Sequence, residues 1–121
     1  MAWEVEYTDE FGAWWNTLDE GQQVSVDASI RLIERYGPVL PYPHSSAIRA
    51  SRHGHMRELR VQHAGRPLRV LYAFDPRRTA ILLLGGRKTG DRHWYESTVP
   101  RADALYDLHL AGLSRESDRN G

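Results

Sequence analysis

The first hydrophobic positions of the chain alternate with polar ones. Trp3, Val5 and Tyr7 are apolar or aromatic, and a glutamate stands between each pair. A period of two residues is typical of a strand that buries one face only. The pattern therefore predicts that the domain opens with an edge strand or a half-buried strand.

The apolar spacing then becomes helical. Thr8 supplies a cap, two acidic residues follow it, and a stripe begins at Phe11, which predicts a first helix. Asp19 and Gln22 have the spacing of a capping box, and a second stripe runs from Val26 until Gly37 and Pro38 end it. We expect two consecutive helices. The two stripes consist of Phe11, Trp14, Trp15 and Leu18, and of Val26, Ile30 and Ile33.

Residues 39–55 show no sustained period and include two prolines. We expect a long loop or short irregular elements here, and loops of this length in small domains are often functional. The following segments 56–63, 67–74 and 79–85 predict three strands joined by tight turns, which form an antiparallel meander. The last of these strands is apolar at nearly every position, so it should lie inside the sheet with both faces covered.

A final helical stripe surrounds Pro100, which suits a first helical position. It consists of Val99, Ala102, Tyr106, Leu110 and Leu113. The polar residues 114–121 predict a disordered tail, so we expect one domain over residues 1–113. The order strand, helix, helix, three strands, helix indicates an α+β fold in which a small antiparallel sheet has its helices packed on one side.

Charge is distributed unevenly along the chain, although the formal net charge is zero. Residues 1–37 carry −6, residues 49–93 carry +8 and residues 94–121 carry −2, whereas residues 38–48 carry no charge. The centre of the chain is therefore a basic module with acidic flanks, which keeps a nucleic-acid partner open. Lys88 is the only lysine among sixteen basic residues.

Other compositional features exclude several classes of protein. The chain has 121 residues, which is the length of one domain, and no cysteine, so disulfides, thiolate zinc sites and thiol nucleophiles are excluded. The N-terminal segment has neither a basic region nor an apolar run, and no stretch is long enough to span a membrane. We expect a cytoplasmic protein without a membrane partner.

Strand periodicity indicates where two arginines point. Leu59 should face the core, which places Glu58 and Arg60 on the opposite face of the strand. Arg69 lies by the same argument on the face opposite Val70. Each guanidinium is thus a charge fixed on a rigid strand, not on a loop. Residues 85–95 add three basic residues and a histidine between glycines and two aromatics, a composition that suits contacts with phosphates and bases.

Simpler interpretations apply to each feature alone. An exposed arginine is most often solvated or paired with a carboxylate. The pair His53 and His55 lacks a third metal ligand, and residues 85–90 lack the spacing of a phosphate-binding GxxxxGK[ST] loop. Trp14 and Trp15 fit a core or a partner interface before a base-stacking role. We expect neither a metal nor a cofactor.

Four motifs carry a resemblance to a known family. They are Glu58-Leu59-Arg60, residues 69–76 (RVLYAFDP), residues 81–86 with Lys88-Thr89-Gly90, and Trp94-Tyr95-Glu96. Together they resemble the RelE/ParE superfamily, specifically its HigB-like branch of type II toxins, also described as phage-derived Gp49-like proteins. The resemblance covers nearly the whole chain and implies a RelE-like fold.

The resemblance implies a metal-independent endoribonuclease that cuts messenger RNA in the ribosomal A site and so inhibits translation and growth. It also implies a cognate helix-turn-helix antitoxin (HigA-like), through which alone the protein would meet DNA. Arg60 and Arg69 match the motif positions and are expected to clamp phosphate, while Lys88 and Tyr95 are candidates for proton transfer or its electrostatic support. Tyr95 or Lys88 would need a lowered pKa to act as a base. Further RNA contacts are expected from Arg52, His53, Arg57, Arg87, His93 and Trp94.

Two alternatives remain open at this stage. A ParE-like toxin would inhibit DNA gyrase without catalytic cations, and an inactive relative would only bind the antitoxin as a regulatory protein. Arg87 departs from the family pattern, in which an acid often precedes the lysine, as in GGDKTG. The acidic N-terminal helices are a candidate binding surface for an antitoxin.

Overall fold

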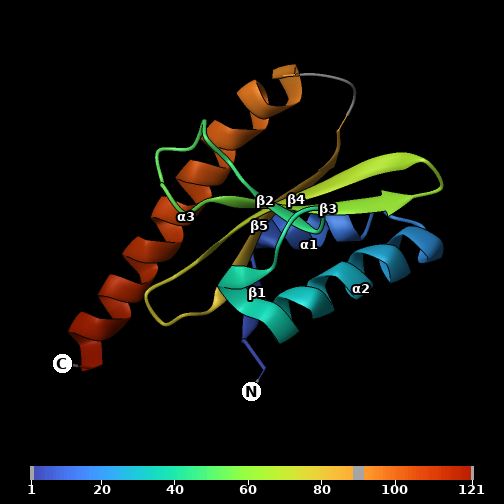
Figure 1. The fold of residues 1–121 in the computed structure, drawn as a ribbon. Helices are drawn as coiled ribbons and strands as arrows, with labels where there is room; N and C mark the ends of the chain where they lie inside the picture. The colour runs from blue at the N-terminus through green and yellow to red at the C-terminus, as the bar shows by residue number, and fades with distance from the viewer. Residues whose placement is uncertain (1, 89–91, 121) are drawn as a thin grey trace.

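The computed structural model describes residues 2–88 and 92–120 (Figure 1). Over these residues a five-stranded sheet has the strand order β1-β5-β4-β3-β2, which confirms the predicted α+β class. The elements are β1 (Val5–Tyr7), α1 (Asp9–Trp15), α2 (Glu20–Tyr36), the 3-10 helix η1 (Gly37–Val39), β2 (Ser45–Ala47), β3 (Arg57–His63), β4 (Arg66–Phe74), β5 (Ala80–Arg87) and α3 (Arg92–Asn120).

The meander β3-β4-β5 is antiparallel, as predicted, and β1 is an edge strand. However, β1 runs parallel to β5, so the sheet is mixed and not purely antiparallel. An alternating pattern reveals a strand but not its direction, and the intervening helices let the chain return to the sheet in either sense. The expected irregular segment 39–55 begins at the last residue of η1 and contains the short strand β2, which pairs with β3.

Helices cover both faces of the sheet, so the expectation of one-sided packing was wrong. Helices α1 and α2 bury Leu59, Val70 and Leu82 together with Phe11 and Ile33. Helix α3 buries the opposite face in a second cluster. The reason is that β4 and β5 are apolar on both faces, and each face must be removed from water. The second cluster includes Leu71, Ala73, Ile81, Leu83, Val99, Ala102 and Tyr106.

The predicted helix starts are confirmed at α1 and α2. The Thr8 hydroxyl accepts a hydrogen bond from the amide of Phe11 at 3.0 Å. The capping box of α2 has both of its bonds, from the Gln22 amide to Asp19 at 2.8 Å and from the Asp19 amide to Gln22 at 3.0 Å. Helix α2 ends at Gly37, where φ is 59° and a side chain would overlap the Trp3 indole, so the position requires glycine.

Helix α3 begins at Arg92, and Pro100 lies inside it, so the predicted start at Pro100 was wrong. The helix starts earlier because Trp94 and Tyr95 already pack on the sheet. Its middle is attached to the β4-β5 turn, where His109 Nε2 and Arg77 Nη2 lie 2.8 and 2.7 Å from the buried carboxylate of Asp75. The helix continues through Asn120, whereas a disordered tail was expected from residue 114. No glycine or proline interrupts residues 114–120, so nothing local ends the helix there.

Candidate functional site

Strands β3 and β4 place two arginines side by side. Arg60 and Arg69 are direct cross-strand partners. Leu59 is buried on the side of α1 and α2, so both guanidiniums lie on the other face, as the periodicity predicted. The sheet thereby holds two positive charges next to each other, an arrangement that is unfavourable unless an anion lies between them.

The carboxylate of Glu58 supplies that anion. Its Oε1 lies 3.1 Å from Arg60 Nη1 and 3.4 Å from Arg69 Nε. The side chains of Glu58 and Arg69 are 3% and 4% exposed, whereas that of Arg60 is 26% exposed. Arg69 also donates through Nη1 to the Leu68 carbonyl at 3.0 Å. Arg69 is therefore a buried charge held in place, and Arg60 is the guanidinium that solvent can reach.

Tyr95, in the first turns of α3, completes the cluster. Its hydroxyl donates to Glu58 Oε1 at 3.1 Å. Burial raises the pKa of Tyr95, the hydrogen bond to Glu58 and its charge raise it further, and Arg69 offsets only part of this effect. A base role would need a lowered pKa, so at neutral pH Tyr95 is a protonated donor that orients Glu58.

Lys88 directly follows the end of β5, and its side chain lies beside Tyr95. Its Nζ lies 5.4 Å from the centroid of the Tyr95 ring, and its amide donates to the Pro67 carbonyl at 3.1 Å. Arg60 and Arg69 face the Glu58 carboxylate and Lys88 lies beside the tyrosine that donates to it, so the four charged groups carry a net charge of +2. The structure thus brings together all four residues expected to be catalytic, around a glutamate that had no assigned role.

Trp94 supports this arrangement through packing. Its ring meets Tyr95 edge to face with 5.1 Å between centroids. A Cβ added at Gly86, the cross-strand partner of Arg69, would lie 2.9 Å from the indole Nε1 of Trp94. The second glycine of the 85–86 pair therefore lets α3 approach the sheet beside the cluster.

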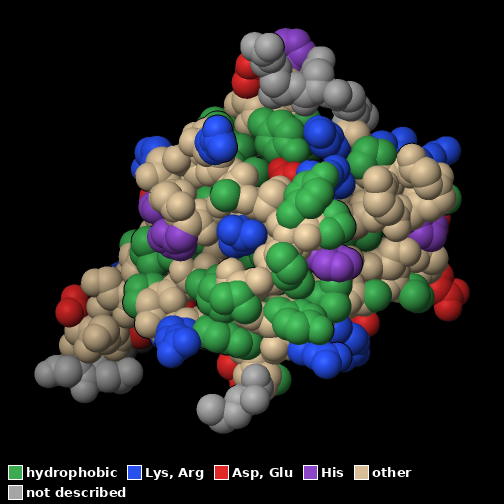
Figure 2. Space-filling view, viewed as in Figure 1, with side chains coloured by type: hydrophobic (Ala, Val, Ile, Leu, Met, Phe, Trp, Pro, Cys, Tyr) green, Lys and Arg blue, Asp and Glu red, His purple; other side chains and the backbone are tan. Residues whose placement is uncertain are grey.

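Two hollows flank the cluster. One, of about 300 Å³, is lined by Ser29, Pro43, His44, Arg60, Gln62 and Arg69. The other, of about 290 Å³, is lined by residues 46–50 together with Glu58 and Tyr95. A ligand could therefore approach the arginines from one side and the carboxylate from the other. Basic and hydrophobic side chains intermingle over the face seen in Figure 2, and acidic ones lie mostly toward its edges.

Other predicted RNA contacts lie elsewhere. Arg57 is on the face of Leu59 and donates to Ser45 Oγ at 2.8 Å and to the Leu40 carbonyl at 3.3 Å, so it serves the structure. Arg87 is the cross-strand partner of Leu68 and is exposed on the face opposite Arg69. The alternation of a strand separates these two arginines from the cluster.

Arg52 and His53 are also remote from the cluster. Both contact the carboxylate of Asp107 and fasten the 48–56 loop to α3. Asp107 lies twelve residues beyond Tyr95 on the helix, a distance of about 18 Å along its axis. His93, at the start of α3, lies 3.5 Å from Glu96 and is largely exposed. Of these expected RNA contacts, Trp94 touches the cluster through the Tyr95 ring.

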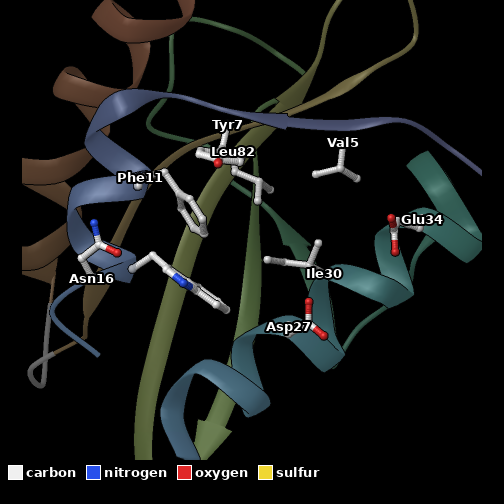
Figure 3. A pocket seen from close by; sticks show the side chains of 10 residues that line it. Val5, Tyr7, Phe11, Asn16, Asp27, Ile30, Glu34 and Leu82 are labelled. Atoms are coloured by element: carbon white, nitrogen blue, oxygen red, sulfur yellow. The ribbon is translucent and has the colours of Figure 1, made fainter. Parts of the chain in front are cut away.

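A wider hollow of about 430 Å³ lies on the other side of the sheet, between β1, α1 and α2 (Figure 3). Phe11, Ile30 and Leu82 form its apolar floor, and Asp27 and Glu34 of α2 lie on its rim. It contains no part of the arginine cluster. Its apolar floor and acidic rim fit a partner protein better than RNA.

The described residues contain neither a group of three or more histidine, aspartate or glutamate side chains placed to hold a metal ion, nor a helix long and apolar enough to cross a membrane. His53 and His55 do lie near each other, 6.1 Å apart between ring centroids, but both rings pack around Tyr106. Their hydrogen bonds go to Asp107 and to the Tyr106 hydroxyl. This pair therefore attaches a loop to α3.

Comparison with known proteins assigns the chain to a family. The sequence model of the family described as "Phage derived protein Gp49-like" matches residues 13–107, which include the whole arginine cluster. The chain belongs to this family. The family predicted from the four motifs is thereby confirmed.

Two relatives from Mycobacterium tuberculosis, named as the candidate toxins HigB2 and HigB3, are similar to this Gp49-like chain. HigB2 is 39% identical over 113 residues, which are 92% of this chain and 56% of HigB2. HigB3 is 43% identical over 99 residues, which are 81% of this chain and 85% of HigB3. The chain therefore spans little more than half the length of HigB2 and most of that of HigB3.

Proposed function

We propose that this protein is the toxin of a type II toxin-antitoxin system and that it cuts messenger RNA on the ribosome without a metal or cofactor. The observation that carries the proposal is the convergence of Arg60, Arg69 and Tyr95 on Glu58, with Lys88 beside the Tyr95 ring. The names of HigB2 and HigB3 and the Gp49-like family support the toxin role.

The proposed reaction is internal transesterification of RNA. The 2′-oxygen attacks the adjacent phosphorus, the bond from phosphorus to the 5′-oxygen breaks, and the products carry a 2′,3′-cyclic phosphate and a 5′-hydroxyl. One group must take the 2′-hydroxyl proton, another must protonate the leaving oxygen, and cations must stabilise the added negative charge. These requirements are met by side chains alone.

The roles follow from exposure and contacts. Arg60 is accessible and grips the nonbridging oxygens of the scissile phosphate, since a guanidinium binds them bidentately. Arg69 is buried and adds positive charge behind it. Lys88, beside the Tyr95 ring, donates the proton to the leaving oxygen or stabilises its charge.

Glu58 is the group that accepts the 2′-hydroxyl proton in this proposal. All three contacts of its carboxylate to Arg60, Arg69 and Tyr95 involve Oε1. Its other oxygen takes part in no hydrogen bond with the described residues, and Glu58 lines the 290 Å³ hollow with Tyr95. Tyr95 fixes the orientation of the carboxylate and is not the base.

The antitoxin belongs to the same proposal. A HigA-like helix-turn-helix antitoxin is the expected partner, and the hollow between β1, α1 and α2 offers it an apolar floor with an acidic rim. The arginine cluster lies on the opposite face of the sheet. An antitoxin segment with basic and apolar residues would match this hollow.

The test is expression in bacterial cells without an antitoxin, followed by genome-wide mapping of messenger 5′-ends. We expect growth arrest and new ends in phase with codons for the unmodified protein, and neither for Arg60→Ala. Arg31→Ala, which alters an exposed arginine on α2, should behave like the unmodified protein. Growth arrest with DNA damage and no new ends would favour gyrase inhibition, and harmless expression would favour an inactive regulator.

A further inference from the structure

The hollow that opens onto Glu58 has one wall to which the proposed chemistry gives no role. This wall consists of residues 46–50, which line the hollow of about 290 Å³ together with Glu58 and Tyr95. The 46–50 wall begins in the edge strand β2, where Ser46 is the direct cross-strand partner of Glu58. Cross-strand partners point to the same face of a sheet, so the wall starts beside the carboxylate. Its position decides how much room a ribose has next to the proposed base.

The sheet fixes only the first part of this wall. Strand β2 has three residues and ends at Ala47. The next residue, Ile48, is buried in the second cluster, and its amide donates to the Met56 carbonyl at 2.9 Å, which closes the 48–56 loop. Residues 49–50 are exposed. The loop therefore needs another anchor beyond Ile48.

Asp103 of α3 is that anchor. Its side chain is 4% exposed. One carboxylate oxygen accepts a hydrogen bond from the Ser51 hydroxyl, and the other accepts one from the Arg52 amide at 3.1 Å. Ser51 Oγ in turn accepts from the amide of His53 at 2.9 Å. Hydrogen bonds to an ionised group are strong and directional, so this buried carboxylate fixes the loop next to the wall.

Asp107, one turn later on α3, also contacts the loop, but near the surface. Its carboxylate is 42% exposed and meets the Arg52 guanidinium, which is 62% exposed, and the His53 ring. Water screens such ion pairs, so they contribute little. The buried contact to Asp103 therefore sets the position of the loop.

We propose that Asp103 is a positioning residue of the nuclease: by holding the loop on α3, it keeps the 46–50 wall at the distance from Glu58 that the reacting ribose requires. The inference rests on the proposed function, because it gives the wall a role in the attack of the 2′-oxygen. A displacement of about 1 Å caused by a change far from the chemistry can slow a reaction about a hundredfold.

Helix α3 couples the two sides of the hollow. Asp103 lies eight residues after Tyr95 on this helix, which is about 12 Å along its axis. Tyr95 orients Glu58 through its hydrogen bond to Oε1, and Asp103 holds the loop that continues from the wall. One rigid helix thus sets both the carboxylate and the surface that confines its substrate.

The test is single-turnover cutting of RNA on programmed ribosomes, which separates the rate at saturation from the protein concentration that gives half of it. Asp103→Ala removes both hydrogen bonds, so the saturated rate should fall about 10- to 100-fold. The half-saturating concentration should change less than about threefold, because the phosphate grip of Arg60 is untouched.

A conservative variant and a matched control accompany it. Asp103→Asn should restore most of the rate, because its carbonyl can accept from the Arg52 amide while its NH₂ group donates to Ser51 Oγ. Asp107→Ala removes the exposed contacts between the same loop and the same helix, and it should cut within about twofold of the unmodified protein.

Further measurements separate positioning from stability. Ser51→Ala removes one of the two bonds from the loop side and should slow the saturated rate in the same direction, which keeps the test open if Asp103→Ala does not fold. Asp75→Asn weakens the fold at the β4-β5 turn, roughly 20 Å along β4 from Arg69, and should cut at the unmodified rate where it is folded. Hydrogen exchange at residues 49–52 should be faster in Asp103→Ala, because their anchor is lost.

Saturated rates of Asp103→Ala and Ser51→Ala equal to that of the unmodified protein would overturn the inference and leave the nuclease intact. A slower rate with unchanged exchange at residues 49–52 would also overturn it, because the loop would not have moved. If the unmodified protein cuts no RNA, the proposed function fails and the inference fails with it.

Discussion

Replacing Glu58 by glutamine removes one negative charge from the centre of the cluster and keeps the size of the side chain. Arg69, whose side chain is 4% exposed, then loses its counterion in a site that is almost closed to water. Removal of one partner of a buried pair typically costs about 3–5 kcal/mol. Because Arg60 is partly exposed and can turn to solvent, we expect a loss of about 3 kcal/mol in the free energy of unfolding.

The assay is equilibrium unfolding in urea at neutral pH. With a slope of about 1.5 kcal/mol per molar urea for a protein of this size, the midpoint should fall by about 2 M. Asp27→Asn removes a carboxylate that pairs with Arg31 on the exposed surface of α2, and it should change stability by less than about 0.5 kcal/mol.

A double variant separates lost charge compensation from lost packing. Glu58→Gln combined with Arg69→Met removes both buried charges and keeps most of the volume, so it should be more stable than Glu58→Gln alone. A loss below about 1 kcal/mol in Glu58→Gln would refute the reasoning. So would a double variant that gains nothing over the single one, because Arg69 would then not depend on Glu58.

Two further predictions concern the scaffold. Gly85→Ala places a methyl group against the Trp14 indole and should destabilise the protein by about 1–3 kcal/mol in the same urea assay, whereas Gly54→Ala, with no atom within 4 Å of the added carbon, should not. Burial would raise the pKa of Asp75, but hydrogen bonds from His109, an arginine and two backbone amides lower it below 3.8. The ionised Asp75 carboxylate therefore stabilises the fold above pH 3.8, and this stabilisation is lost as the pH falls through the pKa that Asp75 has in the folded protein. Asp75→Asn should be less stable than the unmodified protein at neutral pH, and the difference should shrink below pH 3.8. A difference that persists unchanged in acid would contradict this assignment.

Local periodicity predicted most of the secondary structure. The alternation in β3 and β4 reports side-chain direction, so it correctly placed Arg60 and Arg69 on one face. It could not report which helices cover which face, because α3 and the pair α1 and α2 have similar apolar stripes. Strand β2 has only three residues, too few to show a period.

The candidate site was predictable only in part. Charge along a sequence does not show where a side chain ends, so Arg52 and Arg57 were expected near RNA although both are bound to protein groups. Gly86 is the cross-strand partner of Arg69, and successive residues of a strand point to opposite faces, so the alternation along β5 would have placed Arg87 on the face opposite Arg69. Glu58 was missed because a glutamate on a strand is usually solvated, and only the position of α3 makes this one the buried centre of the cluster.

The mechanism is tested most directly by removing one atom from the substrate, the 2′-oxygen that is proposed to attack the phosphorus. An RNA that the protein cuts at one position is prepared again with a 2′-deoxynucleotide immediately 5′ of the scissile phosphate, and both are incubated with the purified protein on programmed ribosomes. The account predicts a 2′,3′-cyclic phosphate product from the first RNA and no cleavage of the second. Equal cleavage of both would contradict it, since the attacking oxygen would then come from elsewhere.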